Sequence, residues 1–108
     1  KAVVTLTEFT VDSNEIDTVQ RQYELDIERA VRDDAGYKAG YVLRERNAKN
    51  HWYIIQVYSD QDALTKHLNS PGYRFMMSQI QGSLQNVTTK VLDGDILVNH
   101  GGQVFVRP

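Results

Sequence analysis

The chain has 108 residues, the length of a single domain, and 41% of them are hydrophobic while 24% are charged. This composition favours a globular class over a disordered or fibrous one. The net charge is −2 and the 12 lysines and arginines are scattered, so nucleic acid is not an expected partner. There is no cysteine, which excludes disulfides and thiolate-based metal sites.

Hydropathy gives no sign of a membrane protein. The apolar runs are far shorter than the roughly 20 residues that a bilayer-spanning helix needs. The first residues show no charged segment followed by an apolar signal core. We therefore expect a soluble, cytoplasmic protein that does not bind a membrane. The chain begins at Lys1, which leaves open whether another segment precedes it.

Residues 2–11 are rich in valine, threonine and phenylalanine and predict a strand. A polar interruption follows, in which Ser13 or Asn14 is the expected cap of a helix of about five turns. Apolar residues recur at three- and four-residue steps along this helix and predict one buried stripe. Its members are Ile16, Val19, Tyr23, Ile27, Ala30 and Val31.

The next segment predicts an antiparallel hairpin, with strands at residues 37–46 and 51–58 and a polar turn at 47–50. Alternation places one set of side chains of its first strand on a common face. These are Tyr37, Ala39, Tyr41 and Leu43. The hairpin leads into another helix, for which Ser59 or Asp60 is the expected cap.

Pro71-Gly72 should interrupt this second helical region, because proline cannot continue a helix from within. Two apolar stripes are predicted, one on each side of the break. The first comprises Ala63, Leu64, His67 and Leu68, and the second comprises Phe75, Met76, Ile80 and Leu84. Residues 86–92 and 96–98 then predict two β pieces around a turn at 93–95.

The resulting order, βαββαβ, predicts a ferredoxin-like α+β fold with four antiparallel strands and both helical regions on one face. The opposite face also carries apolar residues, so we expect a homodimer in which two sheets pack together as a dimeric α+β barrel. We expect the domain to span residues 1–98. Residues 99–108 would form a hairpin or an arm that reaches the partner subunit.

The run GYKAGYVLRERNAKNHWYIIQVYSDQDALTKHLNSPGY resembles the antibiotic biosynthesis monooxygenase superfamily of dimeric α+β barrels. The matches are Gly36-Tyr37, the hairpin, Ser59-Asp60 before Ala63-Leu64, and His67 three residues before Ser70. The resemblance implies the fold more specifically than the reaction. The superfamily includes cofactor-independent oxygenases of quinols and aromatic polyketides, haem-degrading oxygenases and small-molecule isomerases.

Two groups of residues depart from that pattern. Tyr58 and Gln56 stand where the family commonly has tryptophan and glutamate. Haem-degrading members carry an asparagine, a tryptophan and an iron-binding histidine. Those positions are aligned here with Thr5 or Thr7, with His67 and with Met77. The haem triad is therefore missing, and His67 itself would be the remaining haem ligand.

An oxygenase without a cofactor needs an apolar aromatic pocket, a base for a phenolic proton and donors for the resulting oxyanion. His67, on the apolar face of its helix, is the predicted base, and Tyr58 is the second predicted catalytic residue. Gln56 would offer hydrogen bonds beside Trp52. The alternatives are a core histidine bonded to backbone and a tryptophan that serves packing or dimerisation.

Three further residues complete the predicted substrate site: Tyr41, Tyr73 and Arg74, the last as a partner for an anionic ring substituent. Either tyrosine could equally be structural, and Arg74 lies off the apolar stripe. No metal site is expected, because His51 and His100 lack acidic or cysteine residues at ligand spacing.

The resemblance and these residues together predict a monooxygenase without a bound cofactor that acts on a small aromatic, phenolic or quinol-like metabolite. One alternative is a non-catalytic dimeric module that binds a small molecule or regulates a partner. Another is a haem-binding or haem-degrading protein. A solvent-open pocket around His67 would favour the enzyme, whereas a His67 enclosed by packed side chains would deprive it of its base.

Overall fold

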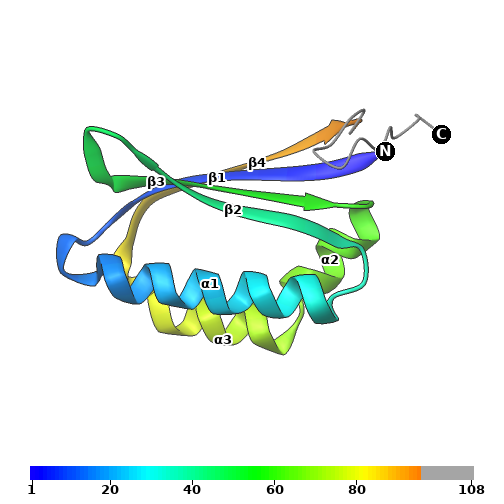
Figure 1. The fold of residues 1–108 in the computed structure, drawn as a ribbon, viewed down its shortest axis with the longest axis horizontal. Helices are drawn as coiled ribbons and strands as arrows, with labels where there is room; N and C mark the ends of the chain where they lie inside the picture. The colour runs from blue at the N-terminus through cyan, green and yellow to red at the C-terminus, as the bar shows by residue number, and fades with distance from the viewer. Residues whose placement is uncertain (96–108) are drawn as a thin grey trace.

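The computed structural model describes residues 1–95 as one antiparallel sheet with all its α-helices on one face (Figure 1). The strands are β1 (Ala2–Val11), β2 (Tyr37–Glu45), β3 (Ala48–Tyr58) and β4 (Leu84–Gly94). The helices are α1 (Ile16–Asp33), α2 (Gln61–Leu68) and α3 (Pro71–Ile80), and short 3₁₀ turns occupy Ser13–Glu15 and Gln81–Ser83.

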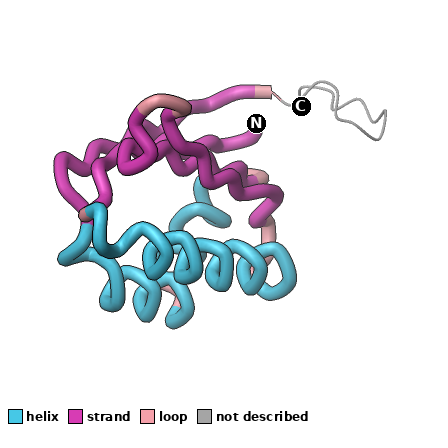
Figure 2. The backbone as a smooth tube through the Cα atoms, turned by 60° about the vertical axis from the view of Figure 1, so that its left-hand side comes forward, coloured by secondary structure: helices cyan, strands magenta, loops and turns pink. Residues whose placement is uncertain are grey.

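The strands lie in the order β2-β3-β1-β4, and every neighbouring pair is antiparallel. This confirms the predicted ferredoxin-like order. The helices form a second layer under the sheet, which Figure 2 shows in cyan below the magenta strands. Among residues 1–95, no helix is long and apolar enough to cross a membrane.

Side-chain caps fix the beginnings of α2, α3 and the 3₁₀ turn before α1, whereas α1 itself begins after Glu15 without a side-chain cap. Asp12, and not Ser13 or Asn14, accepts the first hydrogen bond, from the Asn14 N–H at 3.0 Å. Asp60 caps α2 as expected, accepting from the Ala63 N–H at 2.8 Å. Ser70 caps α3 and Pro71 occupies its first turn, where a missing N–H costs nothing. The predicted break between the two helices is therefore confirmed.

A register shift in β2 changes which side chains share a face. The pairing with β3 slips between Tyr37 and Ala39, so Tyr37 points toward the helices while Tyr41 and Leu43 point away from them. The prediction that all four alternating residues share one face was wrong, because simple alternation fails at a bulge. The turn is also shorter than predicted, since β3 already begins at Ala48.

The last strand is longer than the sequence indicated. Asp93 pairs with Val3 and Gly94 with Ala2, so the strand continues through the predicted turn. Residues 96–98 and the extension at 99–108 lie outside the described residues. β4 also carries a bulge, at which Asn86 adopts a positive φ of 56°.

Three residues predicted to lie on buried helical stripes are exposed. They are Val31, Leu68 and Phe75. α3 ends at Ile80, and Leu84 begins β4 instead of continuing the helix.

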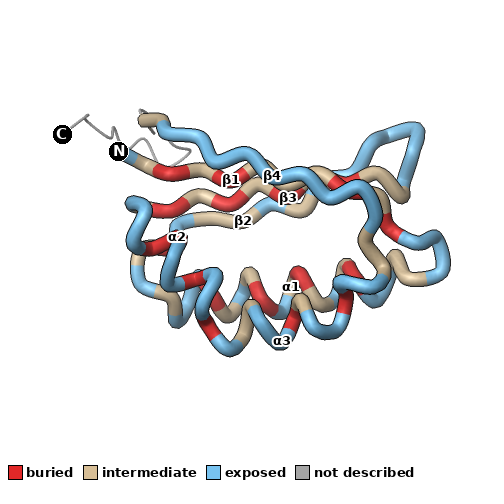
Figure 3. The backbone as a smooth tube through the Cα atoms, turned by 180° about the vertical axis from the view of Figure 1, so that it is seen from behind, coloured by how far each residue is buried: buried red, intermediate tan, exposed pale blue. Residues whose placement is uncertain are grey.

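The interior side chains lie between the sheet and the helices and form two packed groups. Trp52, Phe9 and Met76 belong to the first group, and Tyr58, Tyr37 and Leu64 belong to the second. The exposed run along β4 is pale blue in Figure 3, beside the alternately buried β1 and β3. The second group surrounds the site described next.

Candidate functional site

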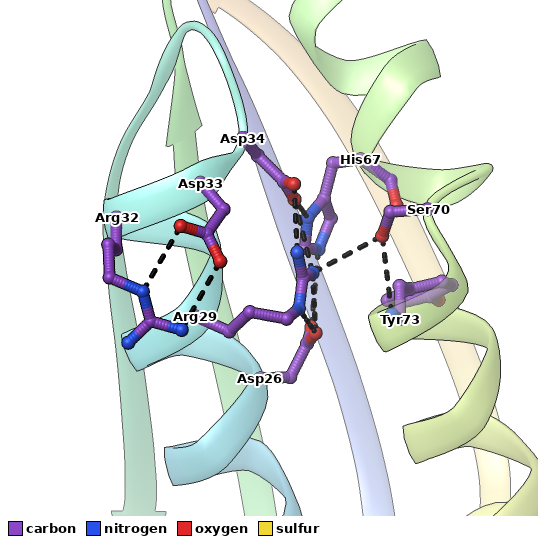
Figure 4. A network of polar contacts seen from close by, with 8 residues as sticks. All are labelled: Asp26, Arg29, Arg32, Asp33, Asp34, His67, Ser70 and Tyr73. Carbon is purple, nitrogen blue, oxygen red and sulfur yellow. Dashed lines mark hydrogen bonds and ion pairs between the residues drawn. The ribbon is translucent and has the colours of Figure 1, made fainter.

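His67 lies at the centre of a buried charged cluster. Its side chain has no exposed surface. Its Nδ1 lies 2.7 Å from Oδ2 of Asp34, which caps the end of α1. Its Nε2 lies 3.5 Å from Oδ2 of Asp26, which projects from α1. The imidazole is thus held between two carboxylates (Figure 4).

Arg29 links these two carboxylates. Its Nη1 and Nη2 donate to the two oxygens of Asp34 at 2.8 and 3.1 Å, and its Nε and Nη2 donate to Oδ1 of Asp26 at 3.2 and 2.8 Å. Nη2 also donates to Oγ of Ser70 at 3.2 Å. The planar guanidinium suits such forked bonds. We refer to Asp26, Arg29, Asp34 and His67 as the charged cluster.

Electrostatics hold Asp34 in its ionised form. Burial alone would raise the pKa of this carboxyl, but the hydrogen bonds from Arg29 and His67 outweigh burial, and the pKa is lowered from its usual range.

Aromatic rings surround the imidazole. The ring centroids of Tyr37, Tyr73 and Tyr58 lie 4.9, 5.1 and 5.7 Å from that of His67. Burial raises the pKa of Tyr37 and Tyr58, so both hydroxyls stay protonated at neutral pH. Tyr37 donates to Oε1 of Gln56 at 2.8 Å.

Three buried polar atoms near this cluster have no hydrogen-bond partner among residues 1–95. They are Oγ1 of Thr5, the hydroxyl oxygen of Tyr58 and Nε2 of His67. Burial has the larger effect and raises the pKa of Tyr58, while the Thr5 hydroxyl lies close enough to the Tyr58 hydroxyl to lower that pKa. Buried polar groups in folded proteins are nearly always paired. The Tyr58 hydroxyl is a donor and the His67 Nε2 is an acceptor if Nδ1 holds the ring proton. Such a set is suited to a small molecule that carries a hydroxyl group.

The structure brings together four of the predicted site residues, namely His67, Tyr58, Gln56 and Tyr73. Trp52 is elsewhere: its indole N–H donates to the Lys49 carbonyl at 2.8 Å and its ring packs on Phe9 and under Arg44. Its surroundings are those of a packing residue.

Two further predicted positions do not meet His67. Tyr41 is 52% exposed on the outer face of the sheet, because of the bulge in β2. Arg74 is exposed and donates to Asn69 at 3.1 Å. The predicted placement of both residues in the pocket is therefore wrong.

Sequence reasoning missed the acidic residues and the arginine of the charged cluster. Asp26 offered a faint signal, because it lies within the apolar stripe between Tyr23 and Ile27. Arg29 and Asp34 are five residues apart across a helix end, a spacing that indicates no pairing by itself. Among residues 1–95, no group of three histidines and acids is arranged to hold a metal ion.

Comparison with known proteins gives a consistent family match. The family model described as antibiotic biosynthesis monooxygenase matches residues 2–79. A search of curated proteins finds no match. One similar solved structure, from Bacteroides thetaiotaomicron, is described as a candidate antibiotic biosynthesis monooxygenase. It is 20% identical, with a TM-score of 0.77 and 93% of each chain covered.

Two other solved structures are similar. A candidate monooxygenase from Lactobacillus acidophilus has a TM-score of 0.81 at 18% identity. The alignment covers 85% of this chain and 44% of that longer protein. The Rv0793 protein of Mycobacterium tuberculosis has a TM-score of 0.77 at 18% identity, with 87% and 95% of the two chains covered. At these identities the structures establish a shared fold.

Proposed function

Because this chain belongs to the antibiotic biosynthesis monooxygenase family, we propose that it is a monooxygenase that acts, without a bound cofactor, on a small phenolic or quinol-like aromatic molecule. The observation that carries the proposal is the buried His67 imidazole, held by Asp34 at 2.7 Å and surrounded by tyrosine rings, with the Tyr58 hydroxyl among them. This combination supplies a base and hydrogen-bonding hydroxyls in an aromatic interior.

His67 is the proposed base. When Nδ1 donates to Asp34, Nε2 presents a lone pair that can accept the phenolic proton. The imidazolium so formed lies 3.5 Å from Asp26 and is stabilised by that carboxylate. Tyr58, kept protonated by burial, donates to the phenolate oxygen. Tyr73 and Tyr37 provide the apolar surfaces of the site.

The oxidation needs no electrons beyond those of the substrate. The phenolate passes one electron to O2, and the two radicals combine to form a carbon–oxygen bond. The oxygen–oxygen bond of this peroxide then breaks as the ring carbon loses its hydrogen. One oxygen atom stays as a quinone carbonyl, while the other leaves as water with that hydrogen and the proton from His67. Phenol and O2 thus give quinone and water.

Oxygen uptake tests the proposal. We expect uptake with hydroquinones or anthrones in the wild-type protein and a fall of about 10²-fold or more in His67→Ala, the effect of losing a general base. His51→Ala is the matched control. That histidine lies on the other side of the sheet, paired with Glu8, and its loss should leave uptake unchanged. Equal rates in wild type and His67→Ala would refute the role of His67.

His67 is completely buried, which is the arrangement expected to deprive an oxygenase of its base, and this favours a second candidate, a non-catalytic module that binds a small molecule. In such a protein the charged cluster would serve stability alone. The same screen separates the two functions, because a module would bind phenols without consuming oxygen. Haem binding through His67 is tested by titration with haem, where an unchanged Soret band removes that alternative.

We also propose that the molecule is a homodimer that packs through the outer face of the sheet. Apolar residues are exposed there, with Tyr41 and Leu43 on β2 and Leu92 on β4. Sedimentation equilibrium should show a dimer that Leu43→Glu disrupts. Val31→Glu, at a more exposed position on α1, should leave the dimer intact. A monomeric wild type would refute this assembly.

A further inference from the structure

A second site lies on the solvent side of the helical layer. A hollow of about 130 Å³ opens between α1 and α3. Two exposed side chains line it, Leu25 from α1 and Phe75 from α3, and the buried Met76 lies at its base. Asp26 and Arg29 of the charged cluster also line it, and the Asp26 side chain is only 2% exposed. Gln22 lines it as well, so the hollow combines apolar walls with an amide, a carboxylate and a guanidinium group.

The size of the hollow fits a single aromatic ring. A protein cavity of about 150 Å³ lined by apolar side chains accommodates benzene. Phe75, which is 60% exposed, offers a ring face against which another ring can stack.

The polar groups in the hollow match a hydroxyl group. Asp26 can accept a hydrogen bond from it, and Arg29 can donate one to it. A carboxylate ligand would meet Asp26, and an ammonium ligand would meet the guanidinium of Arg29. A neutral phenol avoids both repulsions, because its O–H both donates and accepts.

The hollow is connected to the proposed catalytic base by one residue. Oδ1 of Asp26 takes both bonds from Arg29, while Oδ2 lies 3.5 Å from Nε2 of His67. Gly72 allows this arrangement at the start of α3, since a Cβ there would collide with Nε and Cζ of Arg29. The backbone of α3 therefore lies directly against the guanidinium.

We propose that this hollow is an outer binding site for a phenolic ring, through which substrate meets Asp26 and approaches the buried His67. The inference rests on the proposed function for its ligand class. The ring stacks on Phe75 and contacts Leu25, and its hydroxyl group bonds Asp26 and Arg29. The site selects uncharged phenols over benzoates and anilinium ions.

The test is an anaerobic titration with 4-fluorophenol, followed by ¹⁹F NMR and by the methyl signals of Leu25. We expect saturable binding with a dissociation constant on the order of 1 mM, as suits a ligand of this size. Phe75→Ala should weaken binding about fivefold, the loss that one aromatic contact carries. Gly72→Ala, which displaces Arg29, should weaken it at least as much.

Val31→Ala is the control, because Val31 is exposed on α1 and does not line the hollow. It should bind as the wild type does. Phe75 is largely exposed, so Phe75→Ala remains folded even if Gly72→Ala does not. The outer site is overturned if 4-fluorophenol binds without shifting the methyl signals of Leu25, or if Phe75→Ala does not weaken its binding.

Failure of the outer site and failure of the proposed function give different results. The titration involves no turnover, so binding at Leu25 and Phe75 in a protein that consumes no oxygen would refute the monooxygenase alone. The opposite result would refute the outer site alone. In that case oxygen uptake depends on His67 but is unaffected by Phe75→Ala, and the Leu25 signals do not shift.

Discussion

Replacing Arg29 with methionine tests the charged cluster as the main polar stabiliser of the helical layer. The side chain is 23% exposed and makes five hydrogen bonds, to Asp26, Asp34 and Ser70. Its removal leaves two aspartates, one of them fully buried, without their cation. Breaking a buried pair costs about 3–5 kcal/mol. Partial access of water to Arg29 places the expected loss near the low end, at about 3 kcal/mol.

The matched control is Arg32→Met on the same helix. Arg32 is 69% exposed and pairs with Asp33, which is also exposed, so the cost should stay below about 0.5 kcal/mol. Urea unfolding at fixed protein concentration measures both, because association would shift the midpoint with concentration. At roughly 4–8 °C per kcal/mol, the melting temperature of Arg29→Met should fall by about 12–24 °C. Equal stability of the two variants would refute the structural role of the cluster.

Three further predictions concern the backbone and the titrating groups. Gly36→Ala should lower the free energy of unfolding by more than about 1 kcal/mol, because Gly36 has a φ of +81° and a Cβ there would lie 2.6 Å from that of Ala63. Gly82→Ala is the control: a Cβ there meets nothing within 4 Å, so the change should be nearly neutral. Equal melting temperatures of the two variants would contradict this prediction. Asp34 has a lowered pKa in the folded state, so its contribution to stability is complete above about pH 4 and is lost as the pH falls through the folded value. Acid titration of unfolding should therefore show a smaller loss in Asp34→Asn than in wild type. Burial raises the pKa of Tyr23, Tyr37 and Tyr58, so their neutral forms stabilise the fold up to about pH 10, and this contribution is lost above that pH. Tyrosinate absorbance from these residues should therefore appear only when the protein unfolds in alkali. Its appearance in the folded protein would contradict their burial.

The sequence predicted the fold well because hydrophobic periodicity and turn residues are local signals. β1, the hairpin, the Asp60 cap and the break at Pro71 all follow from spacing or backbone chemistry within a few residues. The errors arose where a local rule is interrupted. The bulge after Tyr37 turned Tyr41 to the outer face, and pairing with β1 extended β4 through Gly94.

The site was only partly predictable, because its polar partners come together through tertiary contacts. His67 and Tyr58 could be placed on the inner face from periodicity alone. The Asp34 contact of His67 joins residues 33 positions apart, and the Ser70 contact of Arg29 joins residues 41 positions apart. No sequence spacing encodes either pair. Arg74 was predicted from its charge beside the helix break, but its side chain bonds Asn69 at the surface instead.

The base role of His67 is tested most directly by ¹⁵N NMR of its imidazole in the absence of oxygen. In the free protein we expect a proton on Nδ1, donated to Asp34, and none on Nε2. Adding a hydroquinone under argon should convert the ring to the doubly protonated form as the phenolate develops. An Nε2 that stays unprotonated with ligand bound, or a ring already doubly protonated in the free protein, would contradict the proposed mechanism.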